Sequence, residues 1–239
     1  MQGSIKKIAV VGLGKVGSLV ASLLHYDGVE VTGFDQVIRS DFPFSTQSID
    51  VTDEKVLEDS IKGYDAIVSC LPYFLNTLIV KVAIKTQVHY FDLTEDVPHT
   101  HFVKENSANS KTALVPQCGL APGLIGIIGS SLMRKFDKVR SLELRVGALP
   151  RTPHGLLGYS VNWSAEGIIN EYLNDAEVIR KGEKQIVPSL SELETVIING
   201  IKLEAFITSG GCGTMTETYQ GKLESLDYKT LRYPGHCKL

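Results

Sequence analysis

The chain has 239 residues, and its 24 Lys and Arg against 27 Asp and Glu give a formal net charge of −3. This balance leaves no basic surplus for nucleic acid, and hydrophobic and charged fractions of 43% and 21% are typical of a soluble globular enzyme. No signal-peptide pattern occurs, and no apolar run approaches the roughly 18 residues of a membrane span, so we expect a cytoplasmic protein without a membrane partner. Four cysteines without C-x-x-C spacing predict free thiols and no metal site.

A glycine turn is the most informative feature of the first 35 residues. Residues 8–11 predict a buried parallel strand, and Gly-Leu-Gly-Lys-Val-Gly follows it directly. Gly12 permits a sharp turn, Gly14 lets a pyrophosphate approach the backbone, and Gly17 lets the next helix pack closely on the strand. A lone G-x-G-x-x-G often marks an ordinary turn, but strand, helix, second strand and terminal acid all follow in order here. The stretch therefore predicts a dinucleotide site.

The surroundings of the turn predict how the dinucleotide is held. Lys15 and Val16 open the helix, where free N–H groups and the positive end of the helix dipole face the phosphates. A second β-branched run, residues 29–34, ends in Asp35, where the adenosine ribose is expected. A carboxylate there accepts from the ribose hydroxyls and repels a 2′-phosphate, so Asp35 favours NAD unless it is only a solvated strand end. Arg39 keeps NADP possible.

Strand and helix patterns alternate up to residue 115. Further strands are expected at 48–51, 65–70, 88–92 and 112–115, and helices at about 53–61, 74–86 and 97–109. The order predicts an α/β fold, a Rossmann doubly wound parallel sheet with right-handed crossovers. Ligands bind at the carboxyl ends of the strands in such sheets. The candidate ligand-binding residues at those ends are Cys70, Leu71, Pro72, Asp92, Thr94 and Cys118.

The pattern changes in the second half of the chain. A helix is expected at 124–135 and another at 166–173, with strands at 141–147, 158–163, 203–208 and 228–231. Strands outnumber helices here, which predicts an α+β substrate domain with a mostly antiparallel sheet. We place the dinucleotide-binding domain at residues 1–122 and the substrate and dimerisation domain at 123–239.

With these segments placed, the chain resembles the saccharopine dehydrogenase-like family, and most of all its lysine 6-dehydrogenase and saccharopine reductase branch. The glycine turn is shared by many families, whereas Gly119-Leu120-Ala121-Pro122-Gly123 and Thr230-Leu231-Arg232-Tyr233-Pro234-Gly235-His236 are far more specific. The full set of matching stretches, which includes these two segments, is residues 10–17, 68–72, 90–94, 118–124, 146–150, 204–211 and 229–236.

The resemblance implies NAD(P)-dependent oxidation at the amine-bearing carbon of a lysine-like amino acid, or the reverse reduction, by a homodimer. Relatives continue well past the segment that ends at His236, whereas this chain stops at Leu239, so we expect an incomplete second domain. The alternative is a non-catalytic NAD(P)-binding protein that retains the family fold. A third possibility is another Rossmann enzyme that acts on a carbonyl; the only sequence feature that supports it is the glycine turn, which many such enzymes share.

Three residues are candidates for proton transfer. Asp92 follows an apolar strand and could accept a proton or orient the substrate amine, or it could cap the next helix. Cys118 precedes a predicted helix start that would lower its thiol pKa, or it is a small packing residue. His236 suits proton transfer near neutrality, but it lies three residues from the end, where chains fray.

Substrate-binding candidates lie in the second half. Arg232 is expected to clamp the α-carboxylate in a bidentate manner, the alternative being a surface salt bridge. Thr208, Ser209 and Gly210 could present backbone amides to an anion or form only a tight turn. Tyr159 and Trp163 would share one face of the strand expected at 158–163, where core packing competes with a pocket role.

Overall fold

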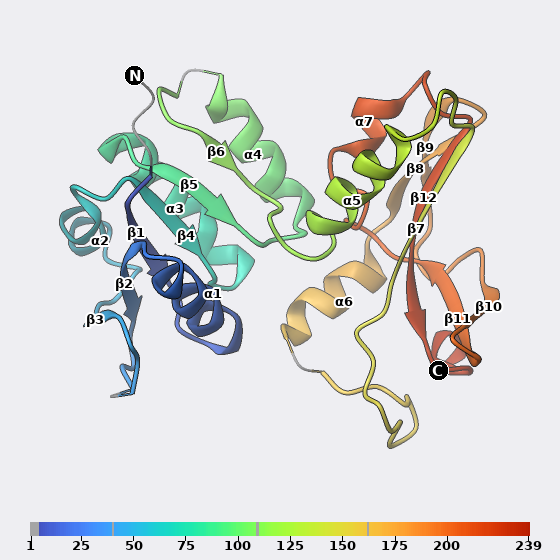
Figure 1. Ribbon diagram of the computed structural model, residues 1–239, viewed down its shortest axis with the longest axis horizontal. Coiled ribbons are helices and arrows are strands. Elements are labelled where there is room, and N and C mark those ends of the chain that lie inside the picture. Colours follow the sequence, from blue (N-terminus) through green and yellow to red (C-terminus); the bar gives the residue numbers. More distant parts are fainter. Residues whose placement is uncertain (1–4, 40, 109, 162) are drawn as a thin grey trace. The chain divides into compact units, whose positions relative to one another are not determined.

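The computed structural model describes residues 5–39, 41–108, 110–161 and 163–239. These residues form two compact units, one that ends at Cys118 and one that begins at Gly119 (Figure 1). Within the described ranges, no helix is both long and apolar enough to cross a membrane.

The first unit is a six-stranded parallel sheet with helices around it (Figure 1). Its strand order, β3-β2-β1-β4-β5-β6, is the doubly wound order with the reversal between β1 and β4, so the predicted Rossmann fold is confirmed. The elements are β1 (Lys7–Val11), α1 (Lys15–Tyr26), β2 (Glu30–Asp35), β3 (Ser45–Ser48), α2 (Glu54–Ile61), β4 (Ala66–Ser69), α3 (Tyr73–Thr86), β5 (His89–Asp92), α4 (Val97–Ser107) and β6 (Leu114–Val115).

The centre of this sheet is apolar on both faces, as a covered parallel sheet requires. Val10 and Val11 point to opposite faces of β1, and both are fully buried in separate clusters. Asp53 and Asp96 accept backbone N–H bonds at the starts of α2 and α4, which satisfies donors that a helix N-terminus otherwise leaves free.

The second unit is built on a mostly antiparallel sheet of order β10-β11-β12-β8-β9, with β7 beside β12, so the expected α+β class is confirmed. The pairing of β7 with β12 is parallel and the others are antiparallel. The elements are α5 (Leu124–Met133), β7 (Ser141–Val146), α6 (Ala165–Leu173), β8 (Ala176–Arg180), β9 (Glu183–Val187), β10 (Glu194–Ile198), β11 (Ile201–Ile207), α7 (Met215–Tyr219), β12 (Ser225–Arg232) and the 3-10 helix η1 (His236–Lys238).

One expectation about this unit was wrong, and three of its strands were not expected. Residues 158–161 and 163, the described part of the strand expected at 158–163, form no strand. Tyr159 and Trp163 are instead joined across a loop, where the Trp163 indole donates to the Tyr159 hydroxyl at 3.3 Å. Strands β8, β9 and β10 were not expected, although two-residue turns at Lys181-Gly182 and Asn199-Gly200, all with positive φ, connect β8 to β9 and β10 to β11.

Candidate functional site

The glycine turn after β1 is built as a close-packed backbone crossing. Gly12 has φ +91°, and a Cβ on it would lie 3.0 Å from the Cys70 carbonyl oxygen. A Cβ on Gly17 would lie 1.8 Å from the Gly12 carbonyl oxygen, so any side chain there would displace the turn. Around Gly14, by contrast, a Cβ would meet no heavy atom within 4 Å. Two glycines therefore shape the turn, and the third leaves open space beside it.

The N-terminus of α1 fits a phosphate group. Its N-cap is Gly14, which offers no side-chain hydrogen bond, whereas Asp53 and Asp96 cap α2 and α4. Lys15 and Val16 are exposed in the first turn, where backbone N–H groups have no partner inside the helix. An uncapped helix start next to an open glycine is the arrangement that binds a pyrophosphate.

Asp35 lies at the end of β2 and faces the turn. Its Oδ2 accepts the Leu13 N–H at 2.6 Å, and its Oδ1 accepts the Val37 N–H at 3.2 Å. The carboxylate is half-buried, so it is both fixed in position and open to a ligand. Arg39 is exposed in the following loop. These residues fit the adenosine end of a dinucleotide, with a fixed negative charge where the ribose is expected.

The residues after β4 pack against the glycine turn. The Cys70 N–H donates to the Val11 carbonyl at 2.8 Å, and burial raises the pKa of its thiol to about 12. A Leu71 methyl group lies 3.0 Å from the Cβ position of Gly12, and Pro72 is the N-cap of α3. We infer from these contacts that Cys70 and Leu71 shape the floor of the dinucleotide site.

Asp92, at the end of β5, is a fully buried hub of hydrogen bonds. Its Oδ2 accepts from the Tyr90 hydroxyl at 2.7 Å and lies 2.8 Å from His99 Nε2. Its Oδ1 accepts the backbone N–H groups of Thr94 at 2.9 Å and Gln117 at 3.2 Å. Both carboxylate oxygens are thus occupied within the unit, and Asp92 holds the segment after β6.

The expected helix cap at Asp92 was placed on the wrong residue. Asp96 caps α4, and its own N–H donates to the Thr94 hydroxyl oxygen at 3.1 Å. Thr94 is buried, and its hydroxyl serves this turn. His99 was missed by the sequence analysis, although a histidine seven residues after Asp92 completes the buried cluster; its Nδ1 has no hydrogen-bond partner among the described residues.

The expected lowering of the Cys118 thiol pKa was wrong. Helix α5 begins at Leu124, where the sequence analysis placed it, and the pKa of this thiol is not lowered. Partial burial, followed by the negative charge of Asp92, raises the pKa of the Cys118 thiol instead. Its Sγ lies 3.5 Å from the Val115 carbonyl oxygen, to which a protonated thiol can donate.

Arg232 is buried in the second unit, at the end of β12, with only 4% of its surface exposed. Its Nε donates to the Tyr172 hydroxyl at 3.1 Å, its Nη1 donates to the Leu231 carbonyl at 2.9 Å, and its guanidinium lies 4.2 Å from the centre of the Tyr159 ring. Among the described residues, no carboxylate forms an ion pair with it and no group accepts from its Nη2. The surface salt bridge considered from sequence is therefore wrong.

His236 does not fray with the chain end. It begins η1, is 7% exposed, and stacks on Phe206 with ring centres 6.2 Å apart. Its Nε2 lies 3.0 Å from the Tyr172 hydroxyl, and its Nδ1 lies 2.9 Å from the Leu157 carbonyl oxygen. Burial lowers the pKa of His236. The structure thus brings Arg232 and His236 together through Tyr172, which the sequence analysis missed.

The segment after β11 uses its polar groups for hydrogen bonds within the second unit. The Thr208 and Thr230 hydroxyls are 2.9 Å apart, and the Ser209 N–H donates to the Glu171 carbonyl at 3.0 Å. Gly210 adopts φ +78° and accepts from Gly213 N–H, which makes a tight turn. The amide of Ser209 is therefore already used, and the tight-turn alternative describes this segment better.

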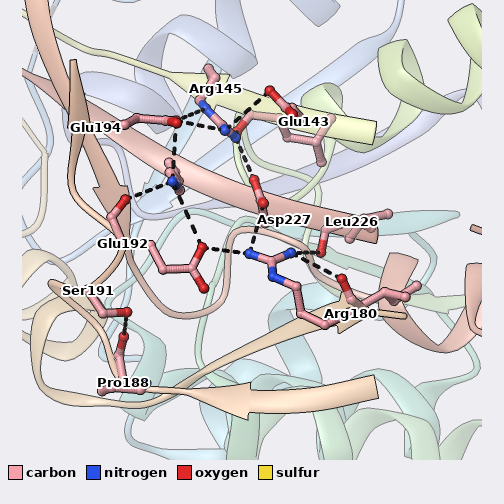
Figure 2. Close-up of polar contacts among 12 residues, drawn as sticks. Glu143, Arg145, Arg180, Pro188, Ser191, Glu192, Glu194, Leu226 and Asp227 are labelled. Carbon is pink, nitrogen blue, oxygen red and sulfur yellow. Dashed lines mark hydrogen bonds and ion pairs between the residues drawn. The ribbon is translucent and has the colours of Figure 1, made fainter. Parts of the chain in front are cut away.

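A charged network on the other face of β12 was also missed. Figure 2 shows Asp227 between two arginines, with Arg145 Nη1 2.6 Å from Oδ1 and Arg180 Nη2 2.9 Å from Oδ2. Glu194 Oε1 lies 2.8 Å from Arg145 Nη2, and Glu192 Oε2 lies 2.7 Å from Arg180 Nη2. The network links side chains of β7, β8, β10 and β12, and both of its arginines form ion pairs with carboxylates.

The first unit is therefore a dinucleotide-binding domain, and the second is a sheet domain with a buried arginine that forms no ion pair with any described residue. Residues 8–117 match the saccharopine dehydrogenase NADP binding domain, and residues 119–239 match the saccharopine dehydrogenase C-terminal domain. The chain belongs to the saccharopine dehydrogenase family. The expected family and the NAD(P) cofactor class are both confirmed.

Two of the relatives that the chain matches are distant in sequence. The chain is 24% identical over 256 residues to the mitochondrial alpha-aminoadipic semialdehyde synthase of Rattus norvegicus, an alignment that covers 98% of this chain and 27% of the relative. It is 24% identical over 206 residues to a saccharopine dehydrogenase (NADP(+), L-glutamate-forming) of Schizosaccharomyces pombe, covering 80% of this chain and 46% of the relative.

A solved structure shows the same fold. The apo saccharopine dehydrogenase (L-Glu forming) from Saccharomyces cerevisiae superposes with a TM-score of 0.77 at 21% identity, over 97% of this chain and 56% of that one. The chain thus spans between about a quarter and a little over half of the length of these relatives.

Proposed function

We propose that the chain is an NAD(P)-dependent oxidoreductase that acts on the amine-bearing carbon of a lysine-like amino acid, as a lysine 6-dehydrogenase or saccharopine dehydrogenase does. The observation that most supports this is Arg232, a buried guanidinium with no anionic partner among the described residues. A guanidinium binds a carboxylate through strong charge-assisted hydrogen bonds, so a carboxylate-bearing ligand would supply the anionic partner. Amino acids supply such a carboxylate.

The first unit supports the cofactor half of the proposal. Gly12, Gly14 and Gly17, with the N–H groups at Lys15 and Val16, are proposed to hold the pyrophosphate. Asp35 is proposed to hold the ribose of NAD in preference to NADP. The bound nicotinamide would supply hydride transfer, and the chain would supply position and charge.

The remaining candidate roles follow from the contacts. We propose that Arg232 binds the substrate α-carboxylate, with Thr208, Ser209 and Gly210 supporting the sheet beside it. Asp92 would have to give up one of four hydrogen bonds before it could accept a proton, which favours a positioning role over a catalytic one. Cys118 would donate as a thiol, since its raised pKa keeps it protonated near neutrality.

The test is a spectrophotometric assay of the full 239-residue chain with NAD or NADP and each of L-lysine, saccharopine and related diamines. We expect absorbance of the reduced nicotinamide to rise with at least one carboxylate-bearing substrate. A thermal-shift series with the same compounds measures binding, since a ligand at 100 times its Kd stabilises by about 2.7 kcal/mol. Cofactor binding without turnover of any of these compounds would refute the proposal and support the non-catalytic alternative.

The homodimer and the cytoplasmic location stay predictions. Sedimentation measures the oligomeric state, and cell fractionation measures the location.

A further inference from the structure

Three side chains in the second unit form an unbroken hydrogen-bonded line that ends on Arg232. It runs from the Leu157 carbonyl to His236 Nδ1, from His236 Nε2 to the Tyr172 hydroxyl, and from that hydroxyl to Arg232 Nε. The three distances are 2.9, 3.0 and 3.1 Å. Each group comes from a different element, so the line is set by the tertiary fold.

The chemistry of the end groups fixes the direction of every hydrogen bond. A carbonyl oxygen only accepts, so His236 must carry its proton on Nδ1 to donate to Leu157. Arginine only donates, so the Tyr172 oxygen accepts from Arg232 Nε. The Tyr172 hydroxyl proton then has one place left to go, which is His236 Nε2. All partners are satisfied only when His236 is a neutral Nδ1–H imidazole.

A cationic His236 would conflict with this arrangement. Its Nε2–H would have to donate to the same Tyr172 oxygen that already accepts from Arg232, and two cations would converge on one hydroxyl. Burial is the largest cause that lowers the pKa of His236, and the positive charge of Arg232 lowers it further; the net direction agrees with the neutral form. The hydrogen bond to Leu157 and the charge of Glu204 act in the opposite direction, and the Glu204 carboxylate accepts from the backbone N–H groups of Gly235 and Cys237, the chain neighbours of His236.

We infer that Tyr172 and His236 are positioning residues that hold the Arg232 guanidinium ready for a substrate carboxylate, and that His236 does not carry the proton of the reaction. Nε and Nη1 of Arg232 are used to fix the group, while Nη2 donates to no described residue and is the donor that we assign to the ligand. The Tyr159 ring, 4.2 Å from the guanidinium, covers its flat side. This inference rests on the proposed function for the identity of the ligand. The hydrogen-bonded line from Leu157 through His236 and Tyr172 to Arg232, which we call the relay, does not rest on it.

The first test needs no substrate. Nuclear magnetic resonance of the histidine ring nitrogens in the full chain, with His236 assigned by comparison with His236→Gln, reports protonation and tautomer directly. We expect His236 to be a neutral Nδ1–H ring at pH 7. An imidazolium or an Nε2–H tautomer at that pH would overturn the relay, whatever the protein catalyses.

The second test separates positioning from packing. Tyr172→Phe removes the shared hydroxyl and keeps the ring that contacts Phe206 at 5.9 Å. We expect KM for the carboxylate-bearing substrate to rise at least tenfold while kcat changes less than threefold. Tyr233→Phe is the matched control, because it also deletes one hydroxyl, which donates to the Pro150 carbonyl at 2.9 Å, and should leave KM unchanged.

The outcomes distinguish the inference from the proposed function. Unchanged KM in Tyr172→Phe, or an equal rise in Tyr233→Phe, would overturn the positioning role while the proposed function stands. If the wild type neither binds nor turns over L-lysine or saccharopine, the proposed function and the carboxylate role fail together, and the ring-nitrogen measurement still decides whether the neutral relay exists. Weaker L-lysine binding in Tyr172→Phe with unchanged binding of cadaverine, which lacks the carboxylate, supports the inference.

Discussion

Replacing Asp35 is expected to change which dinucleotide the chain prefers. The wild-type carboxylate is held by two backbone N–H groups, one of them from Leu13 inside the glycine turn. In Asp35→Asn the amide oxygen can still accept from Leu13, so the turn keeps this hydrogen bond, while the negative charge and the longer bond from Val37 are lost. The variant therefore removes the charge and keeps the contact with the glycine turn. This test is informative because the first unit matches a family domain described as NADP-binding.

The size of the effect follows from two terms. A hydrogen bond from the ribose hydroxyl to a charged group contributes about 1.5–3 kcal/mol, and NADP cannot form it because a phosphate replaces that hydroxyl. Repulsion between two unit charges about 4 Å apart lies between about 1 kcal/mol in water and about 4 kcal/mol at an effective dielectric constant of about 20. The smaller values sum to about 2.5 kcal/mol, which is about 60-fold at tenfold per 1.4 kcal/mol. We expect wild type to prefer NADH by at least this factor.

Calorimetric titration of NADH and NADPH into wild type, Asp35→Asn and the control Asp41→Asn measures the preference. Asp41 is an exposed acid on the same loop, so its replacement removes an equal charge without touching the turn. We expect the preference to fall at least tenfold in Asp35→Asn and to change little in Asp41→Asn. Tighter binding of NADPH than NADH by wild type, or the same ratio in Asp35→Asn, would show that the argument from Asp35 is wrong.

Three further predictions test other parts of the chain. Gly17→Ala should lower the free energy of unfolding by about 3 kcal/mol, since its Cβ would lie 1.8 Å from a backbone oxygen. Gly14→Ala, whose Cβ would meet no heavy atom within 4 Å, should keep the melting temperature and lose dinucleotide affinity at least tenfold. Alkylation of Cys118 should be slower than that of glutathione at pH 7 and keep rising above pH 9, because its thiol pKa is raised; fast reaction at pH 7 contradicts this. Asp227→Asn should cost about 3 kcal/mol in urea unfolding, against less than about 1 kcal/mol for the exposed Glu224→Gln.

The first unit was predictable because its signals are local. The glycine turn, Asp35 and the apolar runs of β1 and β4 each lie within a few residues of the elements they define. In the second unit the hairpin turn at Asn199-Gly200 was an available signal, since Asn-Gly favours positive φ at both central positions. It was missed because β10 carries exposed apolar residues and β9 is mostly exposed, which obscures the alternation of a half-buried strand.

The site residues were predictable in type but not in role. The helix after Pro122-Gly123 begins at Leu124 as expected, but burial and the nearby charge of Asp92, which raise the thiol pKa of Cys118, are set by the tertiary fold. His236 was expected to fray because only its position in the chain was known. Its partners, Leu157, Tyr172 and Phe206, lie between 30 and 79 residues away, and no local pattern reports such contacts.

The alternation of β12 explains why the buried arginine matters. Asp227 and Lys229 lie on one face of the strand, and Thr230 and Arg232 lie on the other. On the first face the buried cations are compensated: Lys229 Nζ lies 3.3 Å from Glu194 Oε1, and Arg145 is paired with both Glu194 and Asp227. On the second face Arg232 is as deeply buried and forms no ion pair among the described residues, while the carboxylate of Glu204, its register partner on β11, accepts from the backbone N–H groups of Gly235 and Cys237. This contrast with the paired cations of the first face supports the proposal that a ligand brings the anion for Arg232.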